Sequence, residues 1–131
     1  MLKQSILVVA LGLATFANAS DWISLGNDGQ REVYLDRQSI KYTNSLKSQR
    51  GVWTKDILLK NTELFKKSDK LVSYSTYDCT KSRIIINEVL HYNKAGKLVT
   101  DSKEGLKDGW QEIPPDSLFD VIQDIVCSAK I

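Results

Sequence analysis

The sequence predicts an α+β domain, in which an antiparallel β-meander of about five or six strands carries one C-terminal helix packed on one face. Two observations predict this fold class. Between residues 21 and 101, short runs of strand-forming residues alternate with turn residues such as Gly, Asn and Asp. Only the last segment, from Pro114 to Cys127, has the apolar spacing of an amphipathic helix.

The expected strands follow one another along the chain, and each is bounded by a turn or a loop. We expect strands at 21–25, 31–36, 49–59, 71–79, 83–92 and 97–101, with charged loops at 61–70 and 102–109. Asp28-Gly29 joins the first two strands as a hairpin turn, because glycine accepts the positive φ that such turns need. In the second strand, Val33 and Leu35 should face one way and Tyr34 the other.

The last segment begins and continues as a helix should. Pro114 and Pro115 block a helix upstream, and Asp116 or Ser117 can cap its free amide groups. Its apolar residues share one stripe, which we expect to be buried against the sheet. The stripe consists of Leu118, Val121, Ile122, Ile125 and Val126.

The N-terminus has the pattern of a secretory signal peptide. Lys3 precedes an apolar run from Ile6 to Phe16, and Ala17-Asn18-Ala19 forms an A-x-A cleavage site. We therefore expect a signal peptide at 1–19 and a single domain at 20–131. The apolar run is shorter than the roughly 20 residues of a transmembrane helix, so a retained anchor helix is the weaker alternative. No cysteine lies near the cut, so no lipid anchor is expected.

Charge and cysteine content narrow the class of protein. The chain has 18 basic and 16 acidic residues, and losing Lys3 with the signal lowers the net charge from +2 to +1. This balance argues against a nucleic-acid-binding protein, which would be strongly basic. Cys79 and Cys127 are the two cysteines, and an exported chain favours a disulfide over free thiols. With His91 they are too few for a zinc site, and we expect no metal or other cofactor.

Catalytic signatures are absent from the sequence. His91 is the single histidine, no G-x-S-x-G motif marks a nucleophile, and Ala95-Gly96-Lys97 lacks the earlier glycine of a phosphate-binding loop. We therefore expect a protein that is not an enzyme. The three tryptophans are widely spaced, as core or sheet-face anchors would be. They are Trp22, Trp53 and Trp110.

An uneven charge distribution gives the candidate binding residues. From Lys41 to Lys70 there are eight basic and three acidic residues, and from Leu98 to Ile131 three basic and seven acidic. A basic surface would favour an anionic partner, although lysines on strand edges also serve to block aggregation. The candidates on such a surface are Lys55, Lys60, Lys66 and Lys67.

Several motifs, in this order, resemble the surface-adhesin protein E family of small exported proteins of Gram-negative bacteria. The matching pieces are Trp22, Val33-Tyr34-Leu35-Asp36 with Ser39-Ile40, Val52-Trp53, Tyr77-Asp78-Cys79, Tyr92 with Gly96, Trp110, Ile113-Pro114-Pro115-Asp116-Ser117 and Val126-Cys127. The resemblance implies an antiparallel sheet with a helix on its concave face and a disulfide joining the two cysteines. It also implies a role at the cell surface, because the family's namesake binds host matrix and serum proteins.

The chain departs from that namesake at the processing site, where Ala19-Ser20 stands in place of a lipidated cysteine. We therefore expect an exported protein in the periplasm, with the cell surface or the medium as alternatives. The expected function is protein binding, with a host matrix protein or an envelope protein as partner. The alternative is a periplasmic envelope protein with a structural or stress-related role and no host ligand. An exposed edge strand could also pair two copies into a homodimer.

Overall fold

A computed structural model of the chain describes residues 20–43, 48–102 and 109–131. The expected signal peptide and most of the expected loop at 102–109 lie outside these residues. The elements are β1 (Trp22–Asn27), β2 (Arg31–Asp36), the 3-10 helix η1 (Arg37–Ser39), β3 (Lys41–Tyr42), β4 (Gln49–Leu58), β5 (Lys70–Asp78), β6 (Arg83–Tyr92), β7 (Leu98–Ser102), β8 (Gln111–Glu112) and α2 (Leu118–Ser128). None of the helices described is long and apolar enough to cross a membrane.

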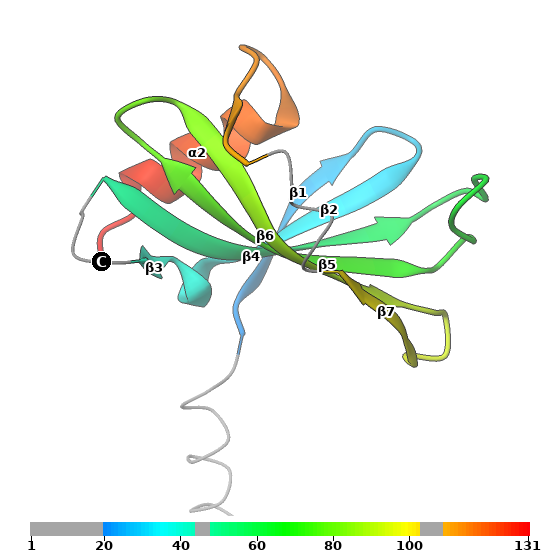
Figure 1. The fold of residues 1–131 in the computed structure, drawn as a ribbon. Coiled ribbons are helices and arrows are strands. Elements are labelled where there is room, and N and C mark those ends of the chain that lie inside the picture. Colours follow the sequence, from blue (N-terminus) through cyan, green and yellow to red (C-terminus); the bar gives the residue numbers. More distant parts are fainter. Residues whose placement is uncertain (1–19, 44–47, 103–108) are drawn as a thin grey trace, which may run out of the picture.

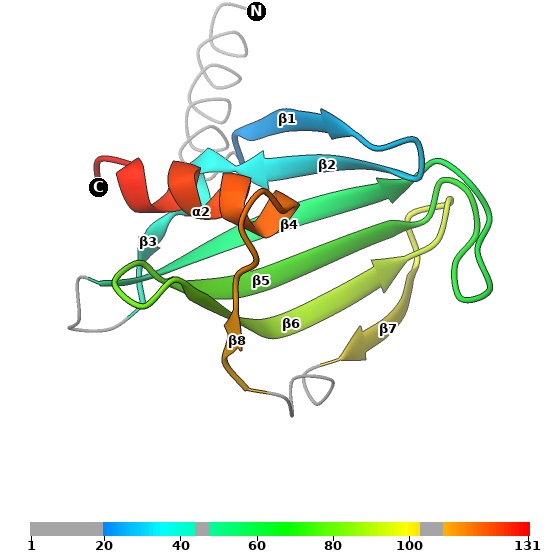
Figure 2. The same cartoon turned by 90° about the horizontal axis from the view of Figure 1, so that it is seen from above.

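All the strands belong to one antiparallel sheet, and α2 lies across one of its faces (Figures 1 and 2). The order is β1-β2-β4-β5-β6-β7, with β3 paired to β4 and β8 paired to β6. The predicted α+β fold is thus confirmed, with two strands more than expected. Both of these, β3 and β8, are two residues long. We call the face that carries α2 the inner face and the opposite one the outer face.

Glycine turns and β-bulges set the connections and the curvature of the sheet. The predicted hairpin turn joins β1 to β2, and Gly29 there has φ +86°. Gly26, with φ +96°, lies at a register shift in β1, where a side chain would strain the backbone. A second shift interrupts the pairing of β5 with β6 next to Tyr74 and Ser75. Such bulges bend and twist strands, and the sheet curves around α2.

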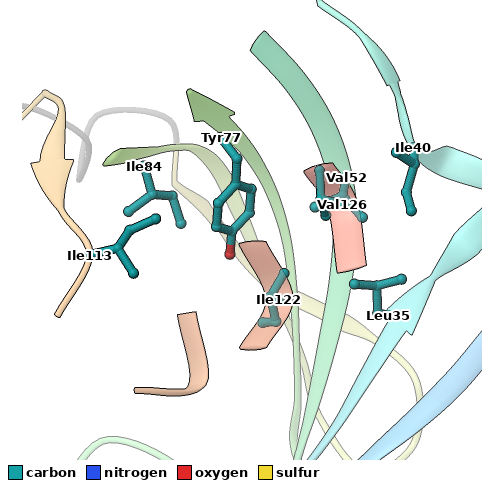
Figure 3. Close-up of a cluster of buried hydrophobic side chains, with 8 residues drawn as sticks. All are labelled: Leu35, Ile40, Val52, Tyr77, Ile84, Ile113, Ile122 and Val126. Atoms are coloured by element: carbon teal, nitrogen blue, oxygen red, sulfur yellow. The ribbon is translucent and has the colours of Figure 1, made fainter. Parts of the chain in front are cut away.

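The hydrophobic core lies between α2 and one end of the inner face (Figure 3). The strands contribute Leu35, Val52, Tyr77 and Ile84, as the alternation of side chains in a strand requires. Ile40 and Ile113 close the sides of the core. The helix contributes Ile122 and Val126, which are the two buried residues of α2.

The prediction that the whole helical stripe is buried is wrong. Ile125 is partly buried, but Leu118 and Val121 are 42 % and 49 % exposed. For Leu118 the reason lies in the sheet, because the side chains beneath the first turns of α2 include small polar ones, among them Ser73 and Ser75. Val121 does not line this space. Small polar side chains cannot fill the space up to the helix, so only the C-terminal half of the stripe is packed.

Candidate functional site

A disulfide and an arginine hold the C-terminal end of α2. Cys127 in α2 is bonded to Cys79, which directly follows β5, with a Cα–Cα distance of 5.8 Å. At the other end of α2 the N-cap is Ser117, whose hydroxyl accepts a hydrogen bond from the amide of Asp120. Of the two N-cap candidates expected from the sequence, Asp116 and Ser117, it is therefore Ser117 that caps the helix.

Arg50 of β4 supplies the contact that sequence reasoning missed. Its Nη1 donates hydrogen bonds to the carbonyl oxygens of Val126 (2.9 Å) and Ala129 (2.7 Å). These carbonyls belong to the last turn of α2 and its C-cap, where a positive charge also complements the helix dipole. The guanidinium lies 5.2 Å from the ring centroid of Tyr42. The alternation of β4 could have placed Arg50 on the inner face, but not its partners.

The outer face carries a cluster of aromatic rings around one lysine. The Nζ of Lys55 lies 4.4 Å from the ring centroid of Trp22 and 5.1 Å from that of Tyr34. Beside it, the rings of Trp53 and Tyr74 lie 5.1 Å apart across β4 and β5. We call these five residues the aromatic face. Because α2 lies on the other side of the sheet, the five side chains are half-buried rather than sealed in the core.

These contacts shift the pKa values of Lys55 and Tyr34 on the outer face. Burial lowers the pKa of Lys55, and the nearby charge of Lys70 lowers it further. The hydroxyl of Tyr34 donates a hydrogen bond to the carboxylate of Glu32, and this bond raises the pKa of Tyr34. Lys55 is therefore a lysine partly stripped of water and held over two rings, a setting in which cation–π attraction is stronger than on an open surface.

The other candidate lysines lie elsewhere. Lys60, Lys66 and Lys67 are exposed in the loop between β4 and β5, whereas Lys55 packs among the rings of the outer face. The four side chains therefore share no single element. Binding by this set of lysines stays a prediction.

The tryptophans fall on the sheet rather than in the central core. Trp22 and Trp53 belong to the aromatic face, and Trp110 lies at the other edge, where the guanidinium carbon of Arg83 is 4.7 Å from its ring centroid. All three are half-buried. The expectation of sheet-face anchors is confirmed for Trp22 and Trp53.

His91 has a structural partner. Its Nε2 lies 2.8 Å from Oδ2 of Asp69, and the ring of Phe65 meets the imidazole edge-on at a centroid distance of 4.9 Å. Asp69 and Phe65 come from the loop between β4 and β5, so this contact fixes the loop to β6. The pKa of Asp69 is lowered, first by the hydrogen bond from the amide of Lys66 and then by His91. Sequence reasoning placed His91 on the sheet but gave no sign of these partners.

The comparisons with known proteins agree with this architecture. A family model described as surface-adhesin protein E matches residues 22–128. The chain belongs to the surface-adhesin protein E family. The matched segment runs from β1 to the last residue of α2, so it contains the whole sheet, the aromatic face and both cysteines. A search of curated proteins found no match.

Membership in the protein E family confirms the resemblance stated from the sequence motifs. It implies an exported, adhesin-like protein and favours binding over catalysis. Within the ranges described, no three His, Cys, Asp or Glu side chains are grouped so that they could hold a metal ion.

Proposed function

We propose that this protein E family member is a non-enzymatic binding protein that contacts a partner protein through its aromatic face. The observation that carries the proposal is one partly desolvated lysine held over two aromatic rings, beside a second pair of rings, on the sheet face opposite α2. Tyrosine and tryptophan are enriched in the energetic centres of protein interfaces, because large rigid rings bury much apolar area at a small entropy cost. The proposed partner is an envelope protein if the chain stays in the periplasm, and a host matrix protein if it reaches the cell surface.

Binding of the mature, oxidised protein to immobilised laminin, fibronectin and collagen tests the proposal. Trp53→Ala should weaken binding by at least about tenfold, since truncation of a central aromatic residue usually has an effect of this size. Trp110→Ala is the matched control, because Trp110 is also half-buried but lies at the opposite edge of the sheet. Thermal unfolding of both variants separates lost contact from lost folding.

The outcomes separate the two candidate functions. Binding that depends on Trp53 and not on Trp110 supports the aromatic face as the contact surface. If both variants bind like the parent, the surface is assigned wrongly. If the parent binds none of the three proteins, the host-matrix proposal fails, and an envelope protein without a host ligand becomes the better description.

Protease treatment of intact cells tests the proposed location in the periplasm. A known periplasmic protein serves as the control for leakage. Survival of both proteins until the outer membrane is opened supports a periplasmic location and a partner within the envelope. Cleavage of this chain while the control survives would place it on the surface, where a host partner can reach it.

A further inference from the structure

A groove runs along the inner face under the N-terminal half of α2. Its volume is about 310 Å³, which is at the lower end of the range for small-molecule sites. A second hollow of about 170 Å³ lies beside it, next to the turn between β1 and β2. The two share Arg31, Val33 and Leu118, so together they form one continuous depression.

The floor of the groove carries hydroxyl groups that the fold itself leaves without partners. Thr54, Ser73, Ser75 and Tyr77 all line it. Ser75 and Tyr77 are 4 % and 1 % exposed, and neither hydroxyl has a hydrogen-bond partner among the described residues. Neither oxygen is sealed from solvent, because the one fully buried side-chain atom without a partner in the described residues is Nε of Arg50. Both hydroxyls thus open onto the groove, where a bound molecule can replace water as their partner. These hydroxyls are therefore placed to bond with a molecule in the groove.

The walls of the groove are apolar. Val33 and Leu71 on the sheet, together with Leu118, Phe119 and Ile122 on α2, face this space. Figure 3 shows Tyr77 reaching from β5 toward α2 with its hydroxyl close to Ile122. An occupant would thus meet hydrocarbon at its sides and hydroxyl groups beneath it.

The charges argue against an anionic occupant. Among the residues that line the two hollows, Arg31 is the one cation, and Asp28 and Asp56 are the acids. Arg31 is already paired, since its Nη1 lies 3.1 Å from Oδ2 of Asp56. Burial raises the pKa of Asp56, although Arg31 opposes that rise. An anionic head group would have to compete with Asp56 for this guanidinium.

We propose that the groove binds a small uncharged amphiphile, with its apolar body against Val33, Leu118 and Phe119 and its hydroxyl or amide group bonded to Ser75 and Tyr77. The site is separate from the aromatic face, because it lies on the opposite side of the sheet. The proposal for the groove is therefore tested independently of the proposed protein partner.

Fluorescence of N-phenyl-1-naphthylamine, an uncharged apolar probe with one N–H group, tests the proposal on the mature, oxidised protein. Saturable binding of one probe per chain is expected, with displacement by decan-1-ol below its solubility limit. Decanoate at pH 7.5 has the same chain length but carries a charge, and it should need at least about tenfold higher concentration. Absence of saturable binding, or equal displacement by the two competitors, would overturn the proposal.

Two matched variants place the probe. Leu118→Gln should weaken probe binding by at least about fivefold, since it puts a polar group into the apolar wall. Val121→Gln should leave binding unchanged, because Val121 lines neither hollow. Both side chains are partly exposed, Leu118 by 42 % and Val121 by 49 %, so both variants should fold. Equal weakening, or no weakening in either, would show that the probe binds outside the groove.

A third variant tests the charge argument. Asp56→Asn removes the carboxylate that neutralises Arg31 and leaves a guanidinium facing the groove. Decanoate should then displace the probe at a concentration similar to that of decan-1-ol. If the preference for the uncharged competitor survives this change, the proposed basis of selectivity is wrong.

Discussion

Replacing Cys127 with serine should lower the free energy of unfolding by about 4 kcal/mol. The disulfide joins residues separated by 48 positions, and the chain-entropy relation for a loop of that length gives about 4 kcal/mol at 25 °C. For a domain of about 110 residues, the entropy of unfolding near the midpoint is about 0.23 kcal/mol per kelvin. The melting temperature should therefore fall by about 15 to 20 °C.

Differential scanning calorimetry of the oxidised parent and of Cys127→Ser measures this change. The double variant Cys79→Ser/Cys127→Ser is the control, because it also lacks the disulfide but does not leave Cys79 as a free thiol. The native fold should persist, since Arg50 still holds the last turn of α2. A fall in melting temperature of less than a few degrees in both variants would refute the reasoning and show that α2 is held by packing and Arg50 alone.

Four further substitutions test other contacts that hold the same fold together. Arg50→Met removes two charge-assisted hydrogen bonds to the end of α2 and should lower the free energy of unfolding in urea by about 2 to 3 kcal/mol. Arg37→Met should have an effect below about 1 kcal/mol, because the Arg37 side chain is 62 % exposed. Gly51→Ala places a methyl group against the ring of Tyr74 and should lower the free energy of unfolding by about 1 to 3 kcal/mol. Made in the Tyr74→Ala variant, where that ring is absent, the same substitution should have a much smaller effect. Burial raises the pKa of Asp78, but hydrogen bonds from two backbone amides and an arginine outweigh it and leave the pKa lowered. The stability that Asp78 contributes is present above the unfolded pKa of about 3.9 and is lost as the pH falls through the lower folded value. Asp78→Asn should therefore flatten the loss of urea resistance between pH 5 and pH 2 relative to the parent, and an unchanged slope would contradict this assignment.

The long elements were predictable because their patterns are local. β6 has the predicted bounds, β4 ends one residue earlier than predicted, and β5 begins and ends one residue earlier than predicted. Ser117 and the two prolines before it likewise placed the start of α2. In each case the signal lies within a few residues of the feature, since strand alternation, turns and caps depend on neighbouring side chains.

The missed features all depend on residues that are distant along the chain. β3 and β8 are too short to show periodicity, and they exist because β4 and β6 offer them pairing partners. Arg50 looks like any charged strand residue until the end of α2, 76 positions later, reaches its guanidinium. The pair of His91 with Asp69 is likewise set by how the loop between β4 and β5 folds back, which no local pattern encodes.

Half of the apolar stripe of α2 stays exposed because the helix is much shorter than the strands beneath it. A helix of 11 residues is about 16 Å long, whereas strands of 10 residues such as β4 and β6 extend for about 33 Å. The disulfide and Arg50 fix the C-terminal end of α2 at one end of these strands, so the helix can seal only the sheet near that end. Beyond it, Thr54, Ser73 and Ser75 replace the large apolar residues of the core. An amphipathic stripe therefore predicts which side of a helix faces the sheet, but the anchoring of its two ends decides how much of that side is buried. In this protein the N-terminal end of α2, which lies away from the disulfide and Arg50, forms the roof of a groove.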